Sequence, residues 1–97
     1  MISLKAKSEM LGRTEMELKS EMAATLGRIG RTLEELIGQL HEIRNELPAL
    51  SVERKEHYRS LHDRAKLYYW YLIIQRESIG IRNHETLRQH YRIPDKI

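Results

Sequence analysis

The sequence contains no cysteine. Disulfide bonds, thiol nucleophiles and zinc or iron–sulfur sites with cysteine ligands are therefore excluded. The chain also opens without the charged and then apolar segment of a secretory leader, because residues 1–7 alternate polar and apolar side chains. Both features favour a cytoplasmic location.

Long apolar runs, phenylalanine and proline are equally scarce. The longest apolar run, residues 67–74, is far shorter than the roughly 20 residues that a membrane-spanning helix needs, so we expect no membrane partner. Phenylalanine is absent and only two prolines occur, while the apolar residues are mostly leucine, isoleucine and methionine, which are compatible with helix. With 97 residues, of which 32% are charged, the chain has room for a single domain, residues 1–97, built from long, solvent-exposed helices.

The sequence does contain an apolar repeat with alternating spacings of four and three residues. It comprises Met22, Leu26, Ile29, Leu33, Leu36, Leu40, Ile43 and Leu47. Such a repeat keeps one stripe of a helix facing a partner helix, and it predicts a first helix of about residues 4–46. Pro48 cannot continue the hydrogen-bond ladder of a helix, so we predict a turn at residues 47–51.

A second repeat with the same spacing follows the turn. Its members are Tyr58, Leu61, Ala65, Tyr68, Leu72, Gln75 and Ile79. Ser51 is a good N-cap and Gly80 can adopt the left-handed conformation that closes a helix, so the second helix spans about residues 52–79. Asn83 can cap a third, short helix of about residues 84–90. Because the connection is short, the two long helices should pack antiparallel, and the predicted fold class is an all-α helical hairpin.

Small and large residues face each other in this hairpin. Counting outward from the turn places Tyr69 level with Gly30 and Leu72 level with Gly27. A glycine in a helix interior costs about 1 kcal/mol relative to alanine, so two of them in one helix require a reason. We therefore predict a layer in which the rings of residues 68–71 pack against the bare backbone of these glycines.

Two features of the hairpin favour self-association. The first helix should be about 65 Å long and the second about 40 Å, so residues 1–20 need cover, either from residues 81–97 or from another chain. Residues 67–74 are apolar all round, and one facing helix cannot bury them. We therefore predict that two hairpins pair as a homodimeric four-helix bundle. The predicted self-association interface comprises Leu67, Tyr68, Tyr69, Trp70, Tyr71 and Ile74.

Residues that could perform catalysis or bind a metal are not grouped. His84 and Glu85 begin a zinc-protease signature, but the second histidine that it needs is replaced by Arg88. His57 and His62 are five residues apart and point in different directions on a helix, so we expect ordinary surface histidines. The candidate ionisable residues of the hairpin, which are Arg28, Arg31, Arg44 and Lys55, all fall outside the apolar stripes. The sequence therefore predicts no enzyme activity, no cofactor and no metal site.

The second half of the chain is basic. Residues 48–97 contain ten Lys and Arg against six Asp and Glu, whereas residues 1–47 contain seven against eight. This charge favours an anionic partner for the C-terminal region. The candidate anion-binding residues are Arg76, Arg82, Arg88 and Arg92.

Within this basic half, Gly80 is followed by Thr86-Leu87-Arg88 and then by Tyr91. The segment resembles the turn and recognition helix of MerR-type transcription regulators, which read Gly-Val-Ser, two residues, Thr-Leu-Arg and then an aromatic residue. The resemblance is confined to residues 80–91. This chain has one extra residue after Gly80, carries Arg76 where a small residue is usual, and has the reverse order of domains. What the resemblance implies is a C-terminal helix that contacts DNA.

The sequence as a whole predicts a non-enzymatic helical interaction and oligomerisation module, with a second copy of the chain or another protein as its partner. The alternative is a nucleic-acid-binding protein that uses the basic C-terminal region. The identity of a partner or a ligand does not follow from the sequence.

Overall fold

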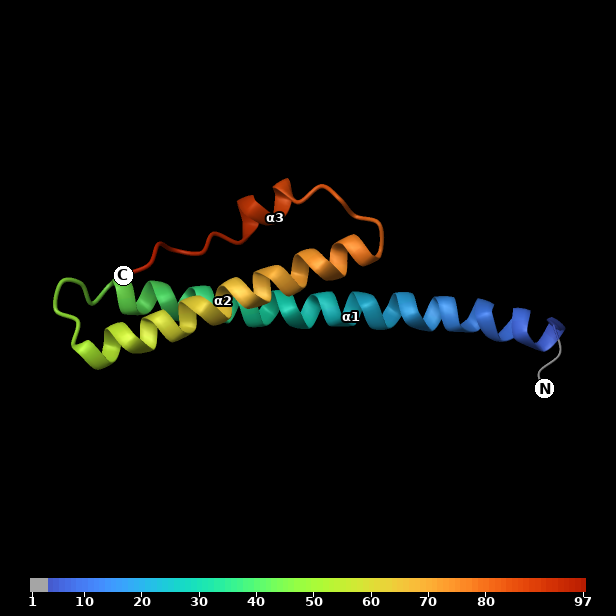
Figure 1. The fold of residues 1–97 in the computed structure, drawn as a ribbon, viewed down its shortest axis with the longest axis horizontal. Helices are drawn as coiled ribbons and strands as arrows, with labels where there is room; N and C mark the ends of the chain where they lie inside the picture. Colours follow the sequence, from blue (N-terminus) through green and yellow to red (C-terminus); the bar gives the residue numbers. More distant parts are fainter. Residues whose placement is uncertain (1–3) are drawn as a thin grey trace.

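The computed structural model describes the backbone of residues 4–97 and the side chains from residue 17 onward. It contains three helices, α1 (Leu4–Arg44), α2 (Val52–Ser78) and α3 (Glu85–His90), and no strand among the described residues. The two long helices pack against each other as an antiparallel hairpin, and α3 lies beside them (Figure 1). The prediction of an all-α hairpin with a short third helix is confirmed.

The turn between α1 and α2 is fixed by local hydrogen bonds. The amides of Glu46 and Leu47 donate to carbonyls three residues earlier, at 3.0 and 3.1 Å, so α1 ends at Arg44, two residues before the predicted end. The Ser51 hydroxyl then accepts a hydrogen bond from the Arg54 amide at 3.1 Å, which confirms its role as N-cap of α2. Arg54 also binds the Glu46 carboxylate through two hydrogen bonds of 3.1 Å, which join the two sides of the turn.

The core follows the two apolar repeats. Its buried members are Leu33, Leu36, Leu40, Ile43, Tyr58, Leu61, Ala65, Leu72 and Leu87. Both stripes therefore face each other over the middle of the hairpin, as their spacing predicts. The last residues of the two apolar repeats are not buried. Leu47 is 42% exposed because α1 has already ended, and Ile79 is 41% exposed at the end of α2.

A glycine closes α2. Gly80 has a φ of +89°, a conformation that side chains with a Cβ rarely adopt. The Ile81 amide donates to the Arg76 carbonyl at 2.9 Å and the Gly80 amide to the Glu77 carbonyl at 3.0 Å, which is the Schellman arrangement. The predicted left-handed closure at Gly80 is thus confirmed, and it reverses the chain toward α3.

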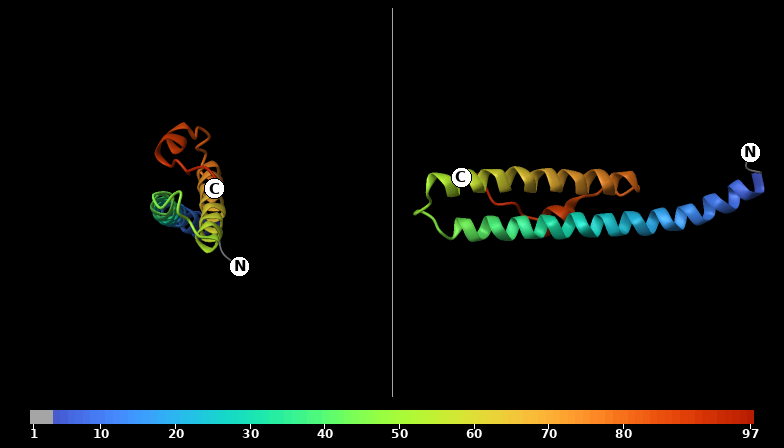
Figure 2. Two further views of the ribbon diagram at one scale, coloured as in Figure 1. Left: turned by 90° about the vertical axis from the view of Figure 1, so that its left-hand side faces the viewer. Right: turned by 90° about the horizontal axis from the view of Figure 1, so that it is seen from below.

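The C-terminal segment, residues 81–97, runs back along the hairpin toward the turn. Figures 1 and 2 together show it running alongside α1 and α2. Leu87 is buried there, and His90 reaches Glu34 of α1 at 3.1 Å. The segment therefore covers the hairpin itself. It does not lie along the part of α1 that extends past α2, although this was one of the two predicted sources of cover for that part.

The prediction that the rings of residues 68–71 pack against Gly27 and Gly30 is wrong. A Cβ placed on Gly30 would lie 2.6 Å from the hydroxyl of Tyr91, a residue of the C-terminal segment. A Cβ on Gly27 would meet only the Arg31 guanidinium, at 3.6 Å. Counting along the two long helices could not reveal this, because the ring arrives from a third segment.

α1 extends well beyond the end of α2 (Figure 1). Within this extension Leu18 is 44% exposed, while the predictions about cover for residues 1–16 lie outside the described side chains. Among the described residues, no helix combines the length and apolar composition that crossing a bilayer requires.

Candidate functional site

Four large apolar side chains lie exposed on one face of α2. They are Leu67 (46% exposed), Trp70 (58%), Tyr71 (42%) and Ile74 (43%), and we call them the outer stripe. Their spacing of three, one and three residues places them on a single helix face. The core residues Leu61, Ala65 and Leu72 occupy nearly the opposite face, so the outer stripe points away from α1.

The six predicted interface residues therefore divide into two groups. Tyr68 and Tyr69 are half-buried and pack against the core of the hairpin, whereas the other four form the outer stripe. One edge contact joins the groups, because the rings of Tyr68 and Tyr71 meet at 74° with their centroids 5.7 Å apart. A helix of apolar residues all round has a covered and an uncovered face, and only the structure distinguishes them.

The hairpin holds the end of the chain by its backbone. We call residues 91–97 the tail. The Tyr58 hydroxyl and the Arg44 guanidinium both donate to the carbonyl oxygen of Asp95, the latter at 3.0 Å, and the His62 ring lies 2.8 Å from the carbonyl oxygen of Pro94. Three donors from two helices thus bind two successive carbonyls of an extended segment.

His62 corrects the prediction of ordinary surface histidines, because it is only 6% exposed. A carbonyl oxygen can only accept, so Nε2 of His62 carries the hydrogen that the Pro94 carbonyl receives. Nδ1 of His62 is buried without a hydrogen-bond partner among the described residues. No spacing in the sequence marks His62, because its role depends on the returning tail.

A pocket of about 580 Å³ opens between α2 and the tail, and we call it the tail pocket. Residues from successive turns of α2 form one wall of the pocket, and the tail forms the opposite wall. The residues that define its chemistry are His62, Lys66, Tyr69, Trp70, Ile93 and Lys96. No pattern in the sequence pairs these aromatic residues with residues 93–96, because the tail has no helical repeat.

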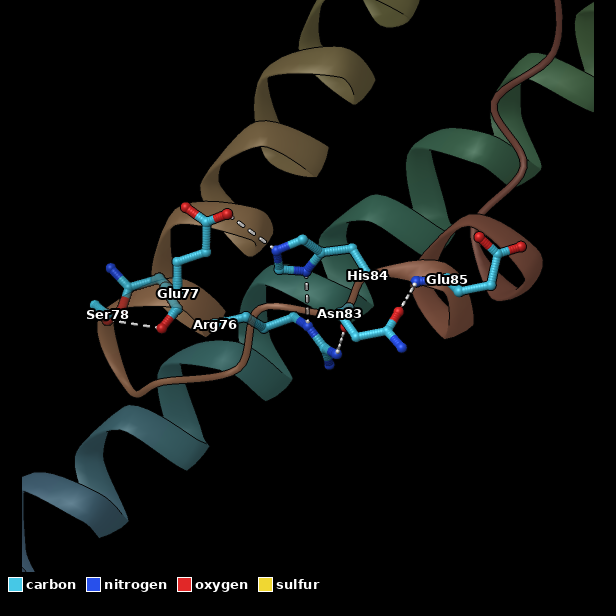
Figure 3. Close-up of polar contacts among 7 residues, drawn as sticks. Arg76, Glu77, Ser78, Asn83, His84 and Glu85 are labelled. Atoms are coloured by element: carbon cyan, nitrogen blue, oxygen red, sulfur yellow. Dashed lines mark hydrogen bonds and ion pairs between the residues drawn. The ribbon is translucent and has the colours of Figure 1, made fainter.

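The four candidate anion-binding arginines are placed differently from one another. Arg76 is half-buried and donates to the Asn83 carbonyl at 3.0 Å and to the His84 ring at 3.4 Å, which ties the end of α2 to the start of α3 (Figure 3). Arg88 pairs with Glu85 at 3.1 Å. Arg82 and Arg92 are exposed. Two of the four are therefore already engaged within the chain.

The connection from α2 to α3 is a network of polar contacts. His84 lies between Arg76 and the Glu77 carboxylate, which is 3.2 Å from its Nε2 (Figure 3). The Asn83 side chain accepts from the Glu85 amide at 3.0 Å, but the N-cap position of α3 is His84, one residue later than predicted. No group of three or more metal-ligating side chains occurs in the part of the chain that the structure describes.

Compared with protein-family models, with curated proteins and with solved structures, the chain shows no match.

Proposed function

We propose that the protein is a non-enzymatic helical module that associates with a second copy of itself through the outer stripe of α2. The observation that supports this proposal is the exposure of Leu67, Trp70, Tyr71 and Ile74, each more than 40%, at the spacing of a helix–helix seam. Exposed apolar residues scattered singly are ordinary on a protein surface, whereas a continuous stripe of large ones is typical of interaction sites.

The order of residues in the outer stripe favours a second copy as the partner. Read in either direction, the stripe is aliphatic, aromatic, aromatic, aliphatic. In a two-fold dimer with antiparallel α2 helices, Leu67 lies level with Ile74 of the second copy, and the aromatic pairs meet at the centre. A two-fold interface requires such a self-complementary patch, and central Trp and Tyr residues are the usual anchors of an interface.

The resulting assembly contains four long helices. Because the outer stripe faces away from α1, the two α2 helices form the centre and each α1 lies on the outside. This arrangement keeps the predicted four-helix dimer and specifies which helices meet. The lack of enzyme activity is proposed on separate grounds. Among the described residues, the buried side chains that carry polar groups are Tyr58 and His62, and both are already hydrogen-bonded to the tail.

Sedimentation equilibrium tests the proposed dimer. We expect the wild-type chain to sediment with twice the monomer mass at protein concentrations of about 10–100 µM, the range in which a micromolar dimer is populated. Ile74→Glu places a charge in the stripe and should give a monomer with unchanged helicity. Val52→Glu is the matched control, because Val52 is 67% exposed on the same helix but lies outside the stripe.

Two results would contradict the proposal. A wild-type monomer at the highest concentration would mean that the outer stripe does not bind a second copy. A dimer that survives Ile74→Glu would mean that the copies meet through another surface. In either case the hairpin fold stands, because circular dichroism of the variants measures it independently.

The alternative, a nucleic-acid-binding protein, rests on the exposed Arg82 and Arg92 and on the basic second half of the chain. It has less support because Arg76 and Arg88 are bound within the chain. Binding to mixed DNA fragments at low salt, with a steep loss of affinity as salt is raised, is the expected result for that function. Absence of binding at about 50 mM salt would remove it.

A further inference from the structure

The tail pocket has one fixed wall and one wall made by the end of the chain. α2 supplies His62, Lys66, Tyr69 and Trp70 from successive turns of one helix. The other wall, residues 93–96, is held in place because its carbonyl oxygens at positions 94 and 95 accept hydrogen bonds from Arg44, Tyr58 and His62. The shape of the pocket is therefore defined before any ligand arrives, which lowers the entropy that binding must overcome.

The charged residues of the pocket come from both walls. Lys66 belongs to α2 and Lys96 to the tail, and neither forms an ion pair with another described residue. Asp95 is the only acidic residue of the lining. The two lysines and Asp95 together therefore carry a net formal charge of +1. Two ammonium groups on opposite walls favour a single anionic group between them.

The rest of the pocket is apolar or aromatic. The side chains of Tyr69 and Trp70 lie on the α2 side, and Ile93 and Pro94 lie on the tail side. A volume of about 580 Å³ is within the range of small-molecule sites, which combine apolar walls with a few polar groups. Indole and phenol rings offer flat faces on which an aromatic ligand can stack.

From these observations we propose that the tail pocket binds a small organic anion, namely an aromatic body that carries one carboxylate or sulfonate group. The body packs between Trp70 and Tyr69 on one side and Ile93 on the other, and the anionic group lies between Lys66 and Lys96. The pocket and the outer stripe share one residue, Trp70, whereas Leu67, Tyr71 and Ile74 do not line the pocket.

Fluorescence titration with two probes of the same body tests the proposal. Anilinonaphthalene sulfonate is an aromatic anion, and phenylnaphthylamine has the same rings without the sulfonate. Trp70 is the only tryptophan of the chain, so energy transfer from tryptophan to a bound probe reports binding within transfer distance of Trp70. We expect the sulfonate to bind about three- to tenfold more tightly than the uncharged probe, as expected for two exposed charge contacts.

Substitutions of the lysines separate charge recognition from simple adhesion to apolar surface. Lys66→Gln and Lys96→Gln should each weaken binding of the sulfonate about two- to fivefold and leave the uncharged probe unaffected. Lys55→Gln is the control, since it removes the same charge from α2 outside the pocket. Trp70→Phe should abolish the energy transfer while the probe, excited directly, still binds.

The titrations are repeated in Ile74→Glu, so that the pocket is measured without self-association through the outer stripe. Unchanged binding in this variant supports the pocket as the site. Loss of binding in this variant, equal affinity for the two probes, or equal effects of Lys55→Gln and Lys66→Gln would each overturn the proposal, whatever the oligomeric state.

Discussion

At the scale of single residues, the contact between Gly30 and Tyr91 decides how closely the C-terminal segment can approach α1. A Cβ on Gly30 would lie 2.6 Å from the Tyr91 hydroxyl, closer than real Cβ contacts allow, so the ring would have to move. Gly38 lies in the same helix and has nothing within 4 Å of the corresponding position. The two glycines therefore differ in surroundings while sharing a helical backbone.

This difference gives a matched pair of substitutions. Gly38→Ala should raise the free energy of unfolding by about 0.5–1 kcal/mol, because alanine favours helix over glycine. Gly30→Ala brings the same gain in helix preference but also displaces the Tyr91 ring. We therefore expect this variant to be less stable than Gly38→Ala by about 1 kcal/mol. Urea unfolding of both variants measures the difference. Equal stabilisation by both substitutions would show that the Tyr91 ring does not press on the helix.

The Tyr91 hydroxyl also gives a dependence on pH. Burial, together with the nearby Glu34 carboxylate, raises the pKa of Tyr91 above its ordinary value of 10.0. The folded protein therefore holds this proton more tightly than the unfolded chain. The contribution of the protonated Tyr91 hydroxyl to the free energy of unfolding is fully present below pH 10. It is lost as the pH rises through the folded-state pKa of Tyr91.

We therefore expect the free energy of unfolding of the wild-type protein to fall more steeply than that of Tyr91→Phe as the pH rises above about 10. The comparison removes the contributions of the other tyrosines and lysines, which both proteins share. Urea unfolding at a series of pH values supplies the measurement. Parallel curves for the two proteins would mean that Tyr91 titrates as it does in the unfolded chain.

At the scale of the elements, the sequence predicts best what depends on neighbours along the chain. The stripes of α1 and α2, the cap at Ser51 and the left-handed closure at Gly80 all arise from spacing or from one residue's backbone preference. Each bound of α2 and α3 lies within one residue of its prediction, and α1 ends two residues early because the turn before Pro48 tightens.

The tail shows why the rest could not be predicted. Residues 91–97 have no helical or alternating pattern, and they are held by hydrogen bonds to their carbonyl oxygens, which every residue possesses. Sequence patterns describe side chains and do not encode such contacts. The burial of His62, the ring over Gly30 and the tail pocket all depend on this segment, so all three were missed together.

At the scale of the whole molecule, the chain is thin, and its backbone extends over 67 × 27 × 14 Å. A body of this shape has a large surface for its volume and buries a modest core. The fully buried large side chains, Tyr58, Leu33 and Leu40, all lie in the part of the hairpin nearer the turn. Pairing through the outer stripe would add a second apolar layer and would stabilise the far half of α2.

Coupling between stability and association follows from this geometry. If the folded dimer is in equilibrium with unfolded chains, a tenfold rise in concentration adds about 1.4 kcal/mol to its stability. Two copies have an unfolding entropy of about 0.4 kcal/mol per kelvin, so the melting temperature should rise by roughly 3 °C for each tenfold step in concentration. Ile74→Glu should melt lower and without this dependence, whereas Val52→Glu should retain it. A wild-type melting temperature that is the same at every concentration would mean that the core of one hairpin alone determines the stability of the fold.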